Sequence, residues 1–313
     1  KRILKNLFMK NKNTKKKYVF LGDLDSINIE LICNSFQVLK NKTKYILIGN
    51  LNNLKKYLYK IKSDISINEI INPYDFDICY NYSLNIFNIE NISSLKYKNL
   101  INQINIANYL ANESHTDLVT MPINKSLIKK NIKFVGVTEY LGKINNKKTI
   151  MLMHGEEFSV IPLTTHINPK KIHLDLNKNN LKEVIIRLLR LIDDKRYNLN
   201  FNHIKFLCYN PHCGEKGTLG KEDIFIKSAL TKHEIIDGPY SGDSAFIKIK
   251  KNTLFLSTYH DQALIPFKIL NKKTINITLG LKYRRLSPAH GTAKEIKGKN
   301  QADNTSYLAC LLI

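Results

Sequence analysis

Several features that mark other protein classes are missing from this chain of 313 residues. No stretch approaches the roughly 18 uninterrupted apolar residues that a membrane-spanning helix needs. No Gly-x-Gly-x-x-Gly follows a predicted strand, so the usual dinucleotide-binding fingerprint is absent. The basic segment 1–17 lacks the apolar core and cleavage site of a secretory signal. We therefore expect no membrane span and no standard dinucleotide loop, and we expect segment 1–17 to be a solvated lead-in to the first strand.

Cysteine is scarce, and the five cysteines form no Cys-x-x-Cys pair. They are odd in number and widely spaced: Cys33, Cys79, Cys208, Cys213 and Cys310. This usage is typical of free thiols in a reducing compartment, which predicts a cytoplasmic location. Cys213 adjoins His212, but adjacent residues of an extended chain point apart, so we do not expect Cys213 to share a metal with it.

Arginine is also scarce, although the formal net charge is +23. Only six of the 49 basic residues are arginine, and guanidinium is the preferred group for reading phosphates and bases. The lysines are spread along the whole chain rather than gathered in one segment. We therefore expect no specific nucleic-acid partner. A phosphorylated small molecule would still benefit from the positive charge.

What the chain does contain is a 43% apolar composition and alternating strand and helix patterns. The predicted strands are 18–21, 45–48, 118–120, 158–163, 204–208, 253–257 and 275–279. The predicted helices are 27–39, 51–61, 101–111, 181–192, 222–230 and 303–312. Segment 64–96 has strand-like fragments without a clear period. Repeated strand-then-helix units predict an α/β fold, with a mostly parallel sheet covered by helices on both faces.

Three histidines, His166, His212 and His260, each follow one of these apolar runs. In an open α/β sheet, ligands bind beyond the carboxyl ends of the strands. Three imidazoles delivered to one edge can hold a single metal ion and leave a coordination position free, which is typical of a catalytic site. A histidine taken singly is more often a hydrogen-bonded side chain, so the prediction depends on the context that the three share.

Polar residues near the third histidine and further downstream add to this pattern. Asp261 can orient an imidazole or hold a proton. Asn276 lies inside a predicted strand, where a buried amide needs partners. The pair Arg284-Arg285 favours a bidentate grip on phosphate or carboxylate, with a surface ion pair as the alternative for Arg285. Segment 290–293 resembles a tight turn entering a helix, where backbone N–H groups can hold an anion.

The second half of the chain resembles the 4-hydroxythreonine-4-phosphate dehydrogenases of pyridoxal phosphate biosynthesis. The resemblance covers most of the chain from about Leu118 onward, in the order and with separations similar to the family's. It is carried by Thr120–Lys125, Gly136–Glu139, Thr164–His166, Asn210–Glu215, Tyr259–Gln262, Asn276–Gly280 and His290–Ala293.

This resemblance implies an isocitrate/isopropylmalate-dehydrogenase-like α/β/α sandwich of two subdomains. We place these at 1–125 plus 286–313 and at 126–285, with the metal histidines in the second. The resemblance also implies a homodimer whose active site lies between subdomains, with both subunits contributing. The family's metal ligands correspond to His166, His212 and His260, and its substrate-binding residues to Thr138, Lys268, Asn276 and Arg285.

The implied reaction is the oxidation of 4-phosphooxy-L-threonine at its 3-hydroxyl by NAD, followed by loss of CO₂ to give 3-amino-2-oxopropyl phosphate. A divalent metal (zinc, magnesium or cobalt) would lower the pKa of the reacting alcohol. Asp261, Asp243 and Lys125 are all candidates for the general base. The sequence identifies no residue that contacts NAD.

The chain departs from the family pattern at several positions. Val137 replaces the usual histidine before the threonine, and Ala289 replaces the usual aspartate before His290. Ser26 and Asn28 replace glycines of the first loop. Three alternatives therefore stay open: a dehydrogenase of another phosphorylated four-carbon hydroxy acid, a non-catalytic descendant that keeps the fold and metal site, and a metallohydrolase that uses the same histidines.

Overall fold

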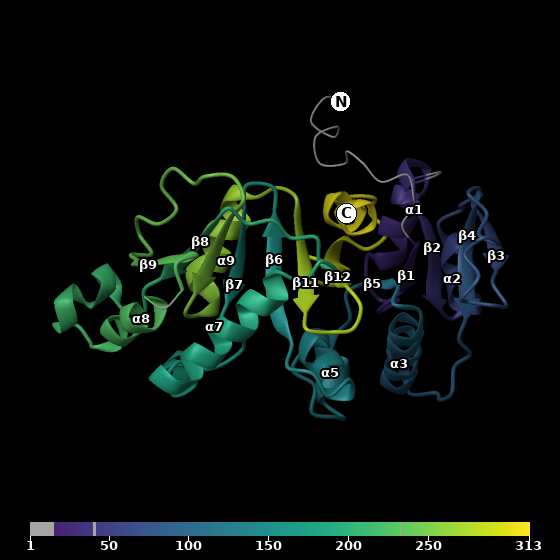
Figure 1. The fold of residues 1–313 in the computed structure, drawn as a ribbon. Helices are drawn as coiled ribbons and strands as arrows, with labels where there is room; N and C mark the ends of the chain where they lie inside the picture. Colours follow the sequence, from purple (N-terminus) through teal and green to yellow (C-terminus); the bar gives the residue numbers. More distant parts are fainter. Residues whose placement is uncertain (1–15, 40–41, 232) are drawn as a thin grey trace. The chain divides into compact units, whose positions relative to one another are not determined.

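The computed structural model describes residues 16–39, 42–231 and 233–313, and it divides the chain into two compact units (Figure 1). The first unit is Lys1–Asn145 with Leu281–Ile313, and the second is Asn146–Gly280. The sequence-based division placed 126–145 and 281–285 with the second unit. In the structure, Leu141, Leu281 and Tyr283 are buried in the core cluster of the first unit, which explains the difference.

The first unit carries a parallel sheet in the order β3-β4-β2-β1-β5-β12. Its strands are β1 (Lys16–Phe20), β2 (Lys44–Gly49), β3 (Ser66–Glu69), β4 (Ser83–Asn88), β5 (Asp117–Thr120) and β12 (Arg285–Pro288). Its α-helices are α1 (Asn28–Leu39), α2 (Leu51–Lys60), α3 (Lys96–Ser114), α4 (Lys125–Lys129), α5 (Val137–Ile144) and α10 (Thr305–Leu312).

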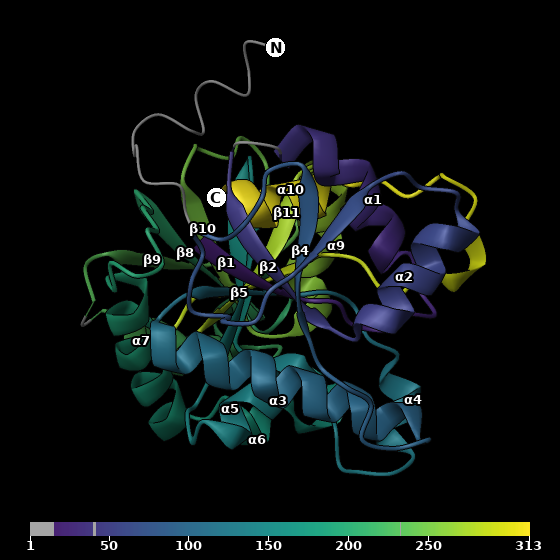
Figure 2. The same cartoon turned by 90° about the vertical axis from the view of Figure 1, so that its right-hand side faces the viewer.

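Strand β1 shows why helices cover both faces of this sheet (Figure 2). Successive side chains of a strand point to opposite faces, and residues 17–20 of β1 are all buried. Tyr18 and Phe20 face the cluster formed with α3 and α5. Lys17 faces the other side, where α10 packs against β12 and α1. Lys17 was expected in the solvated lead-in, and that expectation is wrong for this residue; residues 1–15 lie outside the described part of the chain.

One amide anchors the two places where the chain leaves and re-enters the first unit. Asn108 of α3 accepts hydrogen bonds at Oδ1 from Asn145 Nδ2 and from the Tyr283 hydroxyl, each at 2.7 Å. Asn145 is the last residue before the second unit, and Tyr283 follows soon after the return. Because Asn108 and Tyr283 are buried, these bonds fix both segments to α3.

The second unit has strands in the order β11-β6-β7-β10-β8-β9. The pairs β11–β6 and β6–β7 are antiparallel, and β7–β10, β10–β8 and β8–β9 are parallel. Its strands are β6 (Ile150–Gly155), β7 (Phe158–Pro162), β8 (His203–Leu207), β9 (Ile236–Tyr240), β10 (Thr253–Ser257) and β11 (Thr274–Leu279). Its helices are η2 (Pro169–Lys171), α6 (Ile172–Asp175), α7 (Lys178–Ile192), η3 (Pro211–Gly217), α8 (Glu222–Leu230) and α9 (His260–Leu270).

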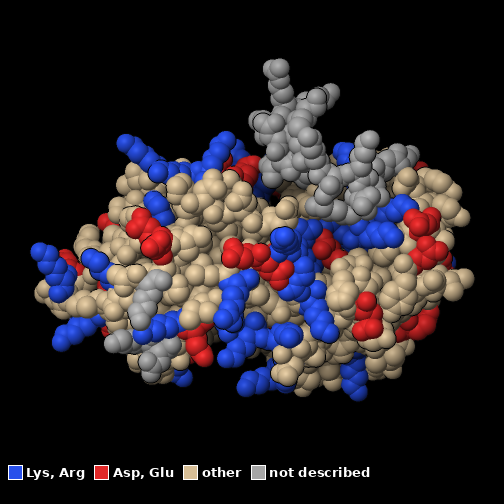
Figure 3. Space-filling view, in the orientation of Figure 1, with Lys and Arg blue, Asp and Glu red and all other residues tan. Residues whose placement is uncertain are grey.

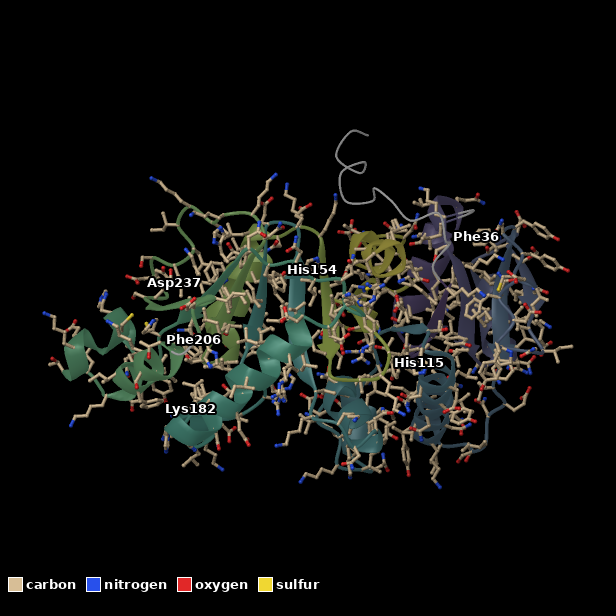
Figure 4. All side chains as sticks on the ribbon, viewed as in Figure 1. Phe36, His115, His154, Lys182, Phe206 and Asp237 are labelled. Carbon is tan, nitrogen blue, oxygen red and sulfur yellow. The ribbon has the colours of Figure 1, made fainter. Side chains whose placement is uncertain are left out.

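Strand β10 is buried along its whole length, so this sheet is also covered on both faces. Helix α9 packs against β7 and β10. Helix α7 places its apolar positions Leu181, Ile185 and Leu188 in the interior. Figure 4 labels two buried core residues: Phe36 on α1 in the first unit and Phe206 on β8 in the second.

The structure confirms the α/β fold with a mostly parallel sheet, and it corrects a further local prediction. The turn at 290–293 leads only into the three-residue 3-10 helix η4 (Lys294–Ile296), not into an α-helix. Residues 297–304 lack the apolar spacing that a helix needs for packing, and Ala293 already has a left-handed φ of 43°. Segment 64–96, which shows no clear period, contains β3 and β4.

Charge is distributed over the surface of both units. On the face drawn in Figure 3, Lys and Arg side chains occur over many elements, with Asp and Glu side chains between them. Within the described residues, no helix is long and apolar enough to cross a membrane.

Candidate metal and substrate site

The three histidine-bearing segments all follow parallel strands of the second unit. Strand β10 pairs in parallel with β7 on one side and with β8 on the other, so the three strands end at one edge of the sheet. His166 lies shortly after β7, His212 lies in η3 after β8, and His260 is the first residue of α9 after β10. The expected common edge is therefore confirmed.

Two of the three imidazole rings lie together, and the third has a carboxylate as its neighbour. The ring centroids of His166 and His260 are 5.8 Å apart. His212 points instead to Asp243, with 4.0 Å between its Nδ1 and the carboxylate Oδ2. Across the ranges 16–39, 42–231 and 233–313, no three His, Cys, Asp or Glu side chains are grouped closely enough to hold a metal ion.

His212 stands in an unusual stretch of backbone, which determines where its ring points. Residues 212–216 all have positive φ, with His212 at φ 48° and ψ 33°, so they form a left-handed turn. This conformation costs a non-glycine residue about 1–2 kcal/mol, and only Gly214 in the turn avoids the cost. A sequence pattern gives no sign of such a turn, so the ring direction could not be predicted.

Two carboxylates accompany the histidines. Asp261 Oδ1 lies 2.6 Å from Nδ1 of its own neighbour His260, so it orients that ring rather than another. Asp243 accepts a hydrogen bond from the Ser241 hydroxyl at 2.6 Å. That bond lowers the pKa of Asp243, and the nearby His212 lowers it further, so Asp243 is ionised at neutral pH.

A cavity of about 490 Å³ adjoins His166 and His260 in the second unit. Its polar groups come from Thr164, Thr165 and Asp261. The apolar part of its wall is formed by Ile172 and the rings of Tyr209 and Tyr259. Concave sites of this kind, with few polar groups in an apolar lining, are typical of small-molecule binding.

Sequence reasoning missed the residues that connect the histidine loops. Gln262 accepts at Oε1 from Thr258 N and Oγ1, both at 3.0 Å, and donates from Nε2 to Cys208 O at 2.6 Å. Thr164 Oγ1 donates to Thr258 O at 2.7 Å. The buried carboxylate of Asp223 accepts from the backbone N–H groups that precede His212. Gln262 belongs to a motif of the resemblance, but the sequence gives it no role.

Arg285 and Thr138 are brought together in the first unit. Arg285 is 4% exposed, so the alternative of a surface ion pair is wrong. Its guanidinium donates to Thr120 Oγ1 from Nε at 2.9 Å and to Thr138 Oγ1 from Nη1 at 3.1 Å. Burial lowers the pKa of Arg285 to about 10, which still leaves it charged at neutral pH.

The neighbouring Arg284 points to the opposite face and is part of a buried ion cluster. Asp117 Oδ2 lies 2.8 Å from Lys17 Nζ and accepts from Arg284 Nε at 3.1 Å. Burial raises the pKa of Asp117, but the charges of Lys17 and Arg284 outweigh burial, and the pKa is lowered overall. The Arg pair is therefore divided between a structural cluster and a candidate binding residue.

The remaining candidates lie on three other elements. Lys268 is exposed on α9, and Lys125 is exposed at the start of α4. Asn276 lies in β11, and its Oδ1 is buried without a hydrogen-bond donor among the residues that the structure describes. A buried polar atom without a partner is exceptional in proteins, so Asn276 stays a candidate for a ligand contact.

His154, labelled in Figure 4, has a structural role instead. Its Nδ1 lies at hydrogen-bond distance, 2.8 Å, from Ser159 Oγ across the β6–β7 pair.

The loop after β1 does not fit a dinucleotide pyrophosphate. Asn28 is fully buried there, and its Nδ2 donates to Leu21 O at 2.9 Å and to Pro122 O at 2.8 Å. Ser26 Oγ bonds Asp23 O and accepts from Asn28 N. The two residues that replace glycines thus fill the space that glycines would leave open, and we assign no cofactor contact to this loop.

The donor set of the second unit fits a divalent cation by its chemistry. Imidazole is a preferred ligand of zinc and cobalt, and neutral rings with a carboxylate partner are its usual form at such sites. His166 and His260 lie within reach of one another, and His260 already has such a partner in Asp261. His212 belongs to the adjacent loop at the same edge.

Comparison with known proteins agrees with the sequence resemblance. The family model for "Pyridoxal phosphate biosynthetic protein PdxA" matches residues 38–313. The chain is 35% identical over 314 residues to a 4-hydroxythreonine-4-phosphate dehydrogenase from Aquifex aeolicus (strain VF5), covering 95% of this chain and 96% of that protein. It is 32% identical over 307 residues to the protein of that name from Sulfurihydrogenibium sp. (strain YO3AOP1), covering 93% and 94%.

A solved structure shares the fold. The 1.25 Å crystal structure of a 4-hydroxythreonine-4-phosphate dehydrogenase from Klebsiella pneumoniae superposes with a TM-score of 0.79 at 24% identity, covering 96% of this chain and 98% of that one. At this identity the likeness establishes the α/β fold.

Proposed function

We propose a reaction for this chain from one premise: it belongs to the family of pyridoxal phosphate biosynthetic protein PdxA, whose curated relatives are 4-hydroxythreonine-4-phosphate dehydrogenases. The chain is accordingly an oxidoreductase of that biosynthesis. The finer proposal is the NAD-dependent, divalent-metal-dependent oxidation of 4-phosphooxy-L-threonine, with decarboxylation to 3-amino-2-oxopropyl phosphate.

The observation that carries the proposal is the common edge of the three histidine loops. Strands β7, β10 and β8 deliver His166, His260 and His212 to that edge, and a cavity large enough for a small metabolite adjoins two of them. A divalent cation held by these imidazoles would supply Lewis acidity, which lowers the pKa of a bound alcohol.

The other residues of the proposal bind and orient an anionic substrate. Arg285 is a buried charge whose rigid fork suits phosphate or carboxylate, and Thr120 and Thr138 hold that fork in place. Asn276 offers a buried, unsatisfied amide oxygen to a substrate donor. Lys268 adds an exposed positive charge. Asp261, Asp243 and Lys125 are the candidates for moving the proton of the hydroxyl.

Two alternative functions are each favoured by a specific observation. Val137 begins α5, directly beside Thr138, and its side chain cannot hydrogen-bond a substrate, which favours a related phosphorylated four-carbon hydroxy acid. Ala289 and Val137 together favour a non-catalytic descendant.

A homodimer that shares its active site is part of the main proposal, and sedimentation of the purified protein would test it.

Turnover separates these possibilities. With 4-phosphooxy-L-threonine, NAD and added zinc, magnesium or cobalt, we expect NADH to appear at 340 nm. Chelation of the metal with EDTA should remove the activity, and returning the metal should restore it. A folded, metal-binding protein that produces no NADH would contradict the dehydrogenase proposal and favour the non-catalytic descendant.

Restoring the family's residue at Val137 tests the substrate assignment. A Val137→His variant should lower KM for 4-phosphooxy-L-threonine by about 2–10-fold, because one added hydrogen bond contributes about 0.5–1.5 kcal/mol. Val135→His, a change of the same type at a nearby exposed valine, should leave KM unchanged. If Val137→His turns over the substrate with wild-type KM, another contact offsets the missing histidine, and this prediction is wrong.

A further inference from the structure

One side chain contacts two of the three histidine loops. Gln262 lies in the first turn of α9, two residues after His260. Its Oε1 accepts from both the backbone N–H and the hydroxyl of Thr258, at 3.0 Å each. Its Nε2 donates to Cys208 O at 2.6 Å, in the segment between β8 and His212.

The third loop joins the same series of bonds through Thr258. Thr164 Oγ1 donates to Thr258 O at 2.7 Å, and Thr164 precedes His166 by two residues. Thr164 and Thr258 are both buried, so these bonds are shielded from competing water. Beyond Cys208, Asp223 accepts from Tyr209 N at 2.6 Å and from Asn210 N at 2.9 Å. The backbones that carry the three imidazoles are thus connected in one continuous polar series.

An amide satisfies both ends of the central position in this series. The Thr258 end needs an acceptor for two donors, whereas the Cys208 carbonyl needs a donor. A carboxylate would satisfy the first requirement and fail the second. An aliphatic side chain of similar size would fail both and leave a buried N–H and a carbonyl unsatisfied.

We propose that Gln262 is the positioning residue that couples the His260 loop to the His212 loop and so sets the geometry in which the imidazoles bind a divalent cation. This inference rests on the proposed function for its metal. Gln262 acts through Thr258 and Cys208, and it is not itself a ligand. Partners that hydrogen-bond metal ligands directly contribute about 10–100-fold to metal affinity, and we expect an effect of that order from Gln262, which acts through the loop backbones.

Two variants separate the two ends of the amide. Gln262→Leu removes both connections, and Gln262→Glu keeps the acceptor for Thr258 while removing the donor for Cys208. Gln37→Leu and Gln37→Glu make the same chemical changes at an exposed position of α1 in the first unit and serve as controls.

Metal affinity is measured with Co²⁺ alone, by calorimetry and by the visible absorption of the bound ion. Both Gln262 variants should weaken Co²⁺ binding by about 10–100-fold and change the absorption bands, because the third imidazole is displaced. The Gln37 variants should bind as the wild type does. Wild-type affinity and an unchanged spectrum in Gln262→Leu would overturn the inference.

Hydrogen exchange of the metal-free protein gives a second readout that does not depend on metal or turnover. The Thr258 amide should exchange faster in Gln262→Leu and stay protected in Gln262→Glu, while residues 209–213 should exchange faster in both. Unchanged exchange at 209–213 would overturn the coupling. If the wild type binds no Co²⁺ at all, the metal-dependent function and the metal-setting role both fail, and the exchange data then decide only whether the loops are coupled.

Discussion

Replacing His212 by alanine should weaken zinc or cobalt binding by more than about 100-fold and reduce turnover to a similar extent. Loss of an outer partner of a ligand already costs about 10–100-fold, and loss of the ligand itself must cost more. The His212 side chain is 63% exposed, so its removal should leave the unfolding temperature almost unchanged. Calorimetry with Zn²⁺ and the rate of NADH formation measure the two effects.

The control for this prediction is another exposed histidine of the same unit. His173 lies in α6 and belongs to none of the candidate sites. His173→Ala should keep wild-type metal affinity and turnover. An active His212→Ala enzyme with undiminished metal affinity would show that His212 is not a ligand and would make its contact with Asp243 a structural one.

Replacing Asp117 by asparagine should lower the free energy of unfolding at pH 7 by about 3–5 kcal/mol, the usual cost of breaking a buried ion pair from one side. The reason is Lys17, which is 0% exposed and would lose the carboxylate of Asp117. Arg284 would lose the same partner. Urea unfolding of the two proteins at pH 7 measures the difference.

The sign of the pH dependence follows from the lowered pKa of Asp117 in the folded protein. The stabilisation is fully present above the ordinary aspartate pKa of about 3.9, and it is lost as the pH falls through the lower folded pKa. The difference between wild type and Asp117→Asn should therefore shrink in acid. Asp77→Asn, which breaks the exposed Lys44–Asp77 pair, should change stability little at any pH. Equal stability of wild type and Asp117→Asn at pH 7 would contradict the role of the buried cluster.

The part of the site that could be predicted from the sequence is the part that strand order determines. Apolar runs followed by histidines predict strands with functional loops, and the parallel register of β7, β10 and β8 brings those loops to one edge. The ring directions could not be predicted, because the left-handed turn at His212 and the contact with Asp243 are set by local backbone conformation.

Alternation along an extended chain explains why the Arg pair does not act together on one ligand, contrary to the expectation from the sequence. Arg284 directly precedes β12 and Arg285 begins it. Adjacent residues of an extended chain point to opposite faces, so the two arginines have different partners. The sequence could not say which partners, because Thr120, Thr138 and Asp117 meet them only through strand pairing and helix packing. The role of Gln262 was hidden for the same reason, since Cys208 lies 54 positions earlier in the chain.

Short polar strands were the weakest part of the fold prediction. Strand β3 (Ser66–Glu69) has no fully buried residue, because it lies at the edge of its sheet, and so it lacks the apolar run of β1 or β10. Strands with a continuous apolar run, such as β1 and β10, could be predicted from the sequence. Strand β6 (Ile150–Gly155) was missed although residues 150–153 are apolar. Where one side is open, the chain is free to use Asn, Ser and Glu.

The most direct test is to locate the metal itself. Crystals grown with Zn²⁺ and 4-phosphooxy-L-threonine, measured at the zinc absorption edge, should give one anomalous peak about 2.0–2.1 Å from a nitrogen of each of His166, His212 and His260. That result requires the His212 ring to leave Asp243 and join the other two. An anomalous peak bound elsewhere, or bound by only His166 and His260 in a protein that turns over substrate, would contradict the three-histidine site.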